Sequence, residues 1–296
     1  MGHDMNKLTT TIAMLFLSAG TAQAADAVAE EAGAPVPVAI EDDRFALTLG
    51  GGVTVQPTYE GSSEYRVAPF PIIAPSFGQS DGPRRFEFRA LDDIRLHLVR
   101  FGGFSAGPIA GYRFGRDEDD ANRLAGLGDV DGGLVVGGFV AYDLYDAGED
   151  RAGLSLGVST QVTGDPFDAN LFPALGRDYG TTADLSAHYA TAVSDRLIMD
   201  ARAGLVWADG DYMDTHFGVS PVQSAASLAG LGVYDPDAGV KNLYLKVGAR
   251  YALTDNWSVR AGVGYSHLVG DAADSPVVEN ESQFFGSLGA AYTLRF

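Results

Sequence analysis

Residues 282–296 read Ser-Gln-Phe-Phe-Gly-Ser-Leu-Gly-Ala-Ala-Tyr-Thr-Leu-Arg-Phe, and this stretch alternates between two kinds of side chain. Every second position, from Phe284 through Leu288 to Phe296, is apolar or glycine, whereas the positions between them from Ser287 onward are small or polar and include Thr293 and Arg295. Successive side chains of a strand point to opposite faces. The period of two therefore predicts a strand with one apolar face and one small or polar face.

The same alternation recurs upstream, at 184–189, 197–207, 243–251 and 257–265. The apolar faces end on aromatic residues, which are Trp207, Tyr251, Trp257, Tyr265, Tyr292 and Phe296. A soluble β-sandwich would also alternate, but a membrane barrel places aromatic girdles at both interfaces and encloses polar side chains in its lumen. The girdles and the number of strands also disfavour a soluble, lipocalin-like barrel. The pattern favours an outer-membrane barrel.

The strand count and the connection lengths agree with this interpretation. We expect about twelve strands, at 45–59, 66–77, 84–90, 94–100, 103–114, 134–145, 152–163, 181–192, 196–208, 241–253, 257–268 and 282–296. The third and fourth are short, so ten strands is the alternative. Short and long connections alternate, as they do between the periplasmic turns and external loops of outer-membrane proteins. The predicted fold class is all-β: a transmembrane, antiparallel, up-and-down barrel over residues 45–296, with both ends periplasmic.

The N-terminal residues have the features of a secretory signal peptide. Lys7 supplies a positive charge, residues 12–17 are apolar, and Ala22-Gln23-Ala24 forms a small-residue cleavage site. We therefore expect a signal peptide at 1–24 and a flexible periplasmic tail at 25–44, which is rich in Ala, Glu, Asp and Pro. The expected location is the outer membrane of a Gram-negative bacterium.

Composition excludes several classes of function. The chain has no cysteine, which excludes disulfides, Cys-ligated zinc and iron–sulfur clusters. Lys and Arg number 20 against 39 Asp and Glu, a net charge of −19 that disfavours binding to nucleic acid. No cofactor is expected, and the partners implied by the fold are outer-membrane lipid and lipopolysaccharide.

Polar residues on the small faces are the candidate functional residues. They are expected to line the lumen, and they are Arg113, Asp184, His188, Asp200, Arg202, Lys246, Arg250 and Arg260. With Arg95, these charges could neutralise one another as a plug, or the neighbouring glycines could leave the lumen open. The chain ends on Tyr292, Leu294 and Phe296, which we interpret as the C-terminal assembly signal.

Two patterns resemble catalytic motifs but predict no enzyme. Residues 103–107 match G-x-S-x-G, yet that motif needs a strand–turn–helix context and a strand-like run follows here. Asp184, Ser186 and His188 share one strand, where the Asp cannot lie behind the imidazole as a catalytic triad requires. We expect these residues to be lumen-lining polar groups.

Carboxylates in the connection 115–133 are weak metal-binding candidates. Asp117, Asp119, Asp129 and Asp131 could hold a divalent ion, because hard cations take several oxygen ligands. The register of an EF-hand is not met. A solvated acidic loop is the alternative, and an ion there could help to bridge lipopolysaccharide phosphates.

The longest connection, 209–240, contains too many apolar side chains to be simply solvated. Residues 224–231 are rich in Ala, Ser and Leu and predict a short helix. We expect this connection to fold over or into the external mouth and to narrow the lumen. A mobile loop available to host surfaces is the alternative.

Several segments resemble the MipA/OmpV family of outer-membrane proteins (MltA-interacting protein). They are Pro-Thr-Tyr-Glu-Gly-Ser at 57–62 with Tyr65, Gly-Tyr-Arg-Phe-Gly-Arg at 111–116, Leu-Gly-Asp-Val-Asp at 127–131, Phe-Gly-Val at 217–219, Gly-Asp-Ala-Ala-Asp-Ser-Pro at 270–276 and Tyr-Thr-Leu-Arg-Phe at 292–296. The resemblance implies an outer-membrane barrel without catalytic residues. It also implies a scaffold that brings a murein transglycosylase to a penicillin-binding protein. The alternatives are a pore or binding barrel linked to osmotic response or antibiotic susceptibility, or an adhesin.

Overall fold

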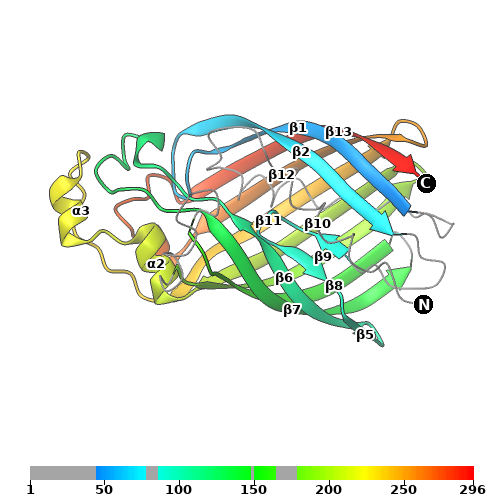
Figure 1. The fold of residues 1–296 in the computed structure, drawn as a ribbon, viewed down its shortest axis with the longest axis horizontal. Coiled ribbons are helices and arrows are strands. Elements are labelled where there is room, and N and C mark those ends of the chain that lie inside the picture. Colours follow the sequence, from blue (N-terminus) through cyan, green and yellow to red (C-terminus); the bar gives the residue numbers. More distant parts are fainter. Residues whose placement is uncertain (1–44, 78–85, 148–149, 165–178) are drawn as a thin grey trace, which may run out of the picture.

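The computed structural model describes residues 45–77, 86–147, 150–164 and 179–296 (Figure 1). Thirteen strands form one sheet. Their bounds are β1 (Phe45–Pro57), β2 (Tyr65–Phe77), β3 (Phe86–Phe88), β4 (Ile94–Leu96), β5 (Val99–Phe101), β6 (Phe104–Arg113), β7 (Gly133–Ala147), β8 (Asp150–Gln161), β9 (Thr181–Ser194), β10 (Leu197–Ala208), β11 (Gly239–Ala252), β12 (Trp257–Leu268) and β13 (Ser282–Arg295). The predicted signal peptide and tail lie outside the described residues. Within the described part of the chain, no helix has the length and hydropathy needed to cross a membrane.

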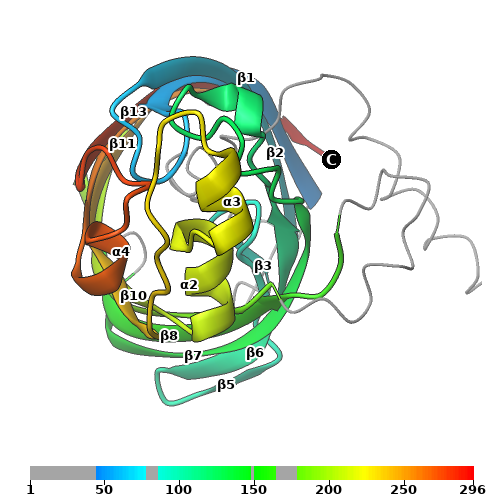
Figure 2. The ribbon, with the colours of Figure 1, turned by 90° about the vertical axis from the view of Figure 1, so that its left-hand side faces the viewer.

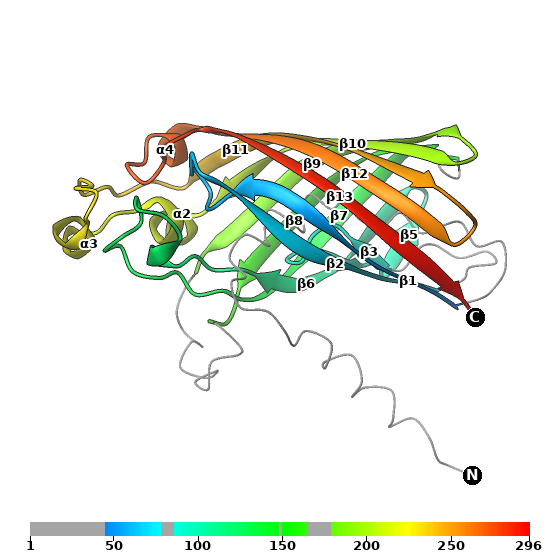
Figure 3. The ribbon, with the colours of Figure 1, turned by 90° about the horizontal axis from the view of Figure 1, so that it is seen from above.

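The sheet curls into a barrel, and consecutive strands pair with one another from β6 through β13 (Figure 3). The pairing order is β2-β1-β13-β12-β11-β10-β9-β8-β7-β6-β4-β3, and β5 pairs with β6. Every pairing is antiparallel, and Ala46 of β1 lies opposite Arg295 of β13, so the first and last strands join. The predicted up-and-down barrel is confirmed.

The apolar faces predicted from the alternation point out of the barrel. Leu288 is 56 % exposed, Phe284 61 % and Val263 65 %, and aromatic residues near the strand ends, such as Trp257 and Trp207, are exposed with them. Keeping such a surface in water would cost about 25 cal/mol for each Å². The belt therefore faces lipid, and the small and polar positions between these residues face the lumen.

The strands predicted at 84–90 and 94–100 differ from those in the structure. β3 and β4 are only three residues long. The strand predicted at 94–100 is divided into β4 and β5, because β4 ends at Leu96 and β5 begins at Val99. Ten strands have ten or more residues, so the larger count comes from these short pieces. The segment carries Glu87, Arg89, Asp93, Arg95 and His97, and charged contacts of these side chains replace a long β-ladder.

Long connections and helices gather at one end of the barrel, and the C-terminus lies at the other (Figure 1). The helical pieces are η1 (Glu118–Asp120), α2 (Gly210–Phe217), α3 (Pro221–Ala226) and α4 (Gly270–Ala273). Connections at the C-terminal end are short, such as the turn between Phe101 and Phe104. This parity, which the sequence predicts, identifies the helical end as external.

Candidate functional site

A charged network crosses the lumen from the short hairpin β3–β4. Arg95 is fully buried, and its guanidinium donates two hydrogen bonds to Asp93, at 2.6 and 2.8 Å. A third bond, of 2.6 Å, goes to the hydroxyl of Ser155 on β8, and the guanidinium lies 4.8 Å from the centre of the Phe139 ring. A buried guanidinium is tolerated only when it is paired and hydrogen-bonded in this way.

The same hairpin reaches the opposite wall through Glu87 and Arg89. Glu87 lies 2.9 Å from Nε of Arg89, 3.6 Å from Nη2 of Arg202 on β10 and 3.3 Å from Nε2 of His97. Arg89 in turn lies 3.9 Å from Asp184 of β9. These contacts join β3, β9 and β10 through the interior, so opposite charges neutralise one another where an open pore would hold water.

The predicted lumen residues all lie on inward-facing strand positions, but they fall into separate groups. Asp184 accepts a 2.6 Å hydrogen bond from Tyr244, and Arg202 donates to Ser186. Nearer the periplasmic end, Asp200 and Arg250 are electrostatic neighbours of Arg260. The remaining predicted residues are Arg113 at the external rim, His188 on β9 and Lys246, whose ammonium lies 4.9 Å from the Tyr244 ring centre.

The lumen residues predicted from the sequence include only part of this network. Glu87, Arg89, Asp93 and His97 were not among the candidate lumen residues, although Arg95 was considered for a plug. The signal was available, because Glu87 and Arg89 are two residues apart, as are Asp93 and Arg95, with apolar residues between each pair. That spacing places the charges on one face of a strand.

The external mouth is covered by α2, as the length and apolar content of 209–240 predict (Figure 2). Asp209 caps the helix by accepting a hydrogen bond from the Tyr212 backbone N–H. Tyr212, Met213 and Phe217 are buried in a cluster with Ala208 and Leu268, which end strands of the barrel, and with Ala272 of α4. The helix is thus attached to the rim by its apolar face.

The second helix of this connection is not where the sequence placed it. The prediction was 224–231, whereas α3 spans Pro221–Ala226. Ser220 and Gln223 form a capping box and Pro221 occupies the first turn, so the helix begins earlier than its Ala and Leu content suggests.

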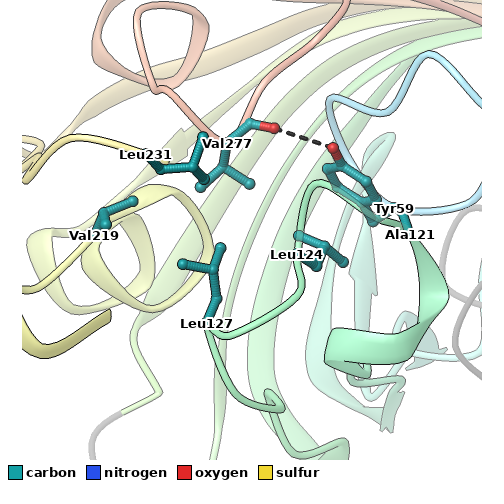
Figure 4. Packing of buried hydrophobic residues seen from close by; sticks show 7 residues of the cluster. All are labelled: Tyr59, Ala121, Leu124, Leu127, Val219, Leu231 and Val277. Atoms are coloured by element: carbon teal, nitrogen blue, oxygen red, sulfur yellow. Dashed lines mark hydrogen bonds between the residues drawn. The ribbon is translucent and has the colours of Figure 1, made fainter. Parts of the chain in front are cut away.

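Loops from distant parts of the chain pack together above α2 (Figure 4). The buried cluster comprises Tyr59, Ala121, Leu124, Leu127, Val219, Leu231 and Val277. The Tyr59 hydroxyl donates to the Val277 carbonyl at 3.1 Å, and the Ser275 hydroxyl donates to the Phe217 carbonyl at 2.6 Å. Most segments that carry the family resemblance meet in this external cap, which we define as α2, α3 and these packed loops.

Basic side chains surround Tyr212 of α2. The guanidinium of Arg113 lies 5.3 Å from its ring centre and the ammonium of Lys241 5.4 Å, and the His216 ring lies 4.2 Å away. Lys241 pairs with Glu60, and Arg116 donates from Nη1 to the His216 carbonyl at 2.8 Å. The pKa of His216 lies well below its usual range, mainly because the ring is buried. The positive charges of Arg116, Arg113 and Lys241 lower it further.

The weak metal candidates are not brought together as an ion site. Among the residues that the structure describes, no three His, Cys, Asp or Glu side chains form a group that could hold a metal ion. Asp129 instead accepts a hydrogen bond from the Glu118 backbone, and Asp131 accepts one from Tyr179. These contacts stabilise the loop, and they give the cation candidates no support.

The catalytic patterns also lack the geometry of an active site. Ser105, the serine of G-x-S-x-G, is 2 % exposed within β6, and the motif runs along that strand where a nucleophile elbow would turn into a helix. Ser186 accepts a hydrogen bond from Arg202, and Asp184 accepts one from Tyr244. In this structure those contacts serve the lumen network.

Comparison with known proteins adds a family and several similar structures. The family model described as "MltA-interacting protein MipA" matches residues 49–294. The putative outer membrane protein YiaT of Escherichia coli K12 is 27 % identical over 119 residues, which are 40 % of this chain and 46 % of YiaT. The alignment thus spans less than half the length of that relative.

Solved outer-membrane proteins resemble the chain at low identity. The COG4313 outer membrane channel from Pseudomonas putida F1 has a TM-score of 0.41 at 13 % identity, with 89 % of this chain and 97 % of the channel covered. The NanC porin has a TM-score of 0.40 at 9 % identity, with coverage of 84 % and 100 %.

Proposed function

This chain belongs to the family of the MltA-interacting protein MipA, and as an outer-membrane β-barrel of that family we propose that it is a structural scaffold of the cell envelope. The observation that carries the proposal is the double closure of the interior. Charges of β3–β4 cross the lumen, and α2 covers the external mouth. Such a barrel is suited to anchoring partners rather than to bulk diffusion or catalysis.

The proposed partners are a murein transglycosylase and a penicillin-binding protein, which would meet at the periplasmic end. That end carries short turns, including Gly102-Gly103 and Asp195-Arg196. The predicted signal peptide at 1–24 would direct export, and the predicted tail at 25–44 would extend the contact surface into the periplasm. The lipid-facing belt would hold the scaffold in the outer membrane beside lipopolysaccharide.

A binding measurement with purified components tests the scaffold. The detergent-solubilised barrel is immobilised, and a purified MltA-type transglycosylase is passed over it with and without the penicillin-binding protein. We expect saturable binding of the transglycosylase and a ternary complex when both are present. The matched control lacks residues 25–44. Absence of binding to the intact barrel would contradict the scaffold.

A second function, holding a small solute, is favoured by one observation at the external cap. Arg116 is 8 % exposed, and no carboxylate among the described residues lies within 4.0 Å of its guanidinium. An uncompensated buried cation is costly and often marks a binding site. Uptake of radiolabelled small anions by cells with and without the protein would test this function.

A further inference from the structure

Arg116 is buried at the external rim, and among the residues that the structure describes no carboxylate lies within ion-pair distance of its guanidinium. Its Nη1 donates to the His216 carbonyl, whereas its Nε is buried without a hydrogen-bond partner among the described residues. Burial lowers the pKa of this guanidinium to about 10, so it remains a cation at neutral pH. A buried donor that lacks a partner costs free energy unless a ligand or water accepts from it.

The neighbouring groups increase the positive character of the same place. Arg113 is 5 % exposed and lies 3.5 Å from Asp92, and Lys241 is 7 % exposed and pairs with Glu60. Both cations lie over the Tyr212 ring. The groups around Arg116 therefore include two further cations, and each of these already has a carboxylate.

His216 and Tyr59, two further titratable neighbours, carry no negative charge at neutral pH. His216 is neutral or positive by its chemistry, and its lowered pKa keeps it neutral. Burial raises the pKa of Tyr59, and the negative charge of Glu279 raises it further, so the phenol stays protonated. Glu60 is a carboxylate that attracts Arg116 electrostatically, but it forms an ion pair with Lys241.

We propose that Arg116, with Arg113 and Lys241, forms a binding site beneath α2 for one small oxyanion of the carboxylate or phosphate type. A guanidinium presents several N–H donors in a fork that matches these anions. The inference deepens the solute-binding function proposed above and rests on it. Such an anion would accept from Nε of Arg116 and neutralise its charge.

Isothermal titration of the detergent-solubilised barrel with sodium phosphate tests the site, with sodium chloride at equal ionic strength as the reference. We expect saturable phosphate binding and a higher midpoint in the heat-modifiability assay. Arg116→Gln should weaken phosphate binding at least tenfold without lowering the anion-free midpoint, because it removes an uncompensated charge. Arg116→Lys, which keeps the charge but loses the fork, should weaken it less.

Arg123→Gln is the matched control, since Arg123 lies in the same cap but donates to the Pro276 carbonyl. It should bind phosphate like the wild type. A parallel titration with acetate distinguishes carboxylates from phosphates, and one with lipopolysaccharide distinguishes a lipid phosphate from the free ion.

Two results would overturn the site. One is no binding of phosphate, acetate or lipopolysaccharide beyond that of chloride. The other is equal binding by wild type and Arg116→Gln. If cells still take up small anions while the purified barrel fails to bind them here, the site is wrong and the solute-binding function stands.

Discussion

A buried charged side chain in this barrel needs hydrogen-bonding or ion-pairing partners to offset the cost of its burial. Arg95 donates hydrogen bonds to Asp93 and Ser155 and lies over the Phe139 ring, so protein groups compensate its buried charge. At Gly180 the constraint is steric. This residue has a φ of +85°, and a Cβ there would lie 2.1 Å from the Tyr212 backbone nitrogen, so α2 can approach β9 only over a glycine.

Truncation of Arg95 should be among the most destabilising changes in the lumen. Arg95→Ala empties a fully buried position and removes both hydrogen bonds to the partly exposed Asp93, and hydrogen bonds to charged groups contribute about 1.5–3 kcal/mol each. Guanidinium unfolding of the barrel in lipid vesicles measures the loss. The control is Arg100→Ala, because Arg100 is partly exposed and lies 3.8 Å from Asp143, and exposed pairs contribute up to about 1 kcal/mol. Equal losses would show that the interior is hydrated.

The lipid-facing register makes a second prediction at this scale. Val263 is 65 % exposed on the outside of β12, opposite Val247 of β11. Val263→Arg should cost roughly 2–4 kcal/mol near the membrane midplane, whereas Val263→Leu should be close to neutral. The same vesicle unfolding assay compares them. Tolerance of the arginine would mean that this face does not contact lipid.

His216 gives the cap a pH dependence. Its pKa is depressed in the folded state, so below an ordinary histidine pKa of about 6.5 the opened cap binds a proton that the closed cap does not. Cap stability should therefore fall as the pH is lowered from 7 toward 5. Amide exchange of residues 210–217 reports this loss, and His216→Gln should remove the pH dependence. Constant protection in the wild type over that range would contradict it.

Among the elements, the long strands were predictable and the short ones were not. A period of two is a local property, so alternation predicts the outward face of β13 from its own residues. The bounds of β3, β4 and α2 depend instead on partners far along the chain, such as Ser155 for Arg95 and Leu268 for Met213. Helix content alone misplaced α3 because capping at Ser220 decides where it begins.

β2 shows how an edge of the sheet is protected. Pro69, Pro71 and Pro75 are separated by even numbers of residues. The N–H groups that these prolines lack would therefore all point to the same edge of the strand. The register with β1 is continuous from Tyr65 to Phe77, which places those positions on the edge away from β1. The pairing path of the described residues ends at β2, where prolines discourage pairing with another chain.

The outer part of the cap should be dispensable for assembly. Residues 220–232 include α3, whose Val222 and neighbouring Leu228 are exposed, whereas the buried contacts with the rim come from α2. Deletion of 220–232 should leave a heat-modifiable barrel with its mouth still covered. Semi-native gel mobility and uptake of small hydrophilic solutes measure the two properties. A strong rise in uptake would assign the closure to α3.

At the scale of the whole molecule, the barrel combines a lipid-facing belt, a charged lumen and a cap over the external mouth. The belt holds the barrel in the outer membrane, and the network from β3–β4 joins opposite walls. Sequence predicted the belt and most inward charges, but not that they are joined across the lumen, because that depends on where a short hairpin lies in space. A closed interior would separate the proposed scaffold from a general diffusion pore.

Single-channel recording in a planar bilayer tests the closed interior most directly. The purified, heat-modifiable wild-type barrel is inserted at neutral pH and compared with the Glu87→Gln variant, which weakens the links to Arg89 and Arg202. The wild type should insert without sustained conductance, and the variant should show transient openings. Stable, large and continuous conductance of the wild type would contradict a closed scaffold barrel.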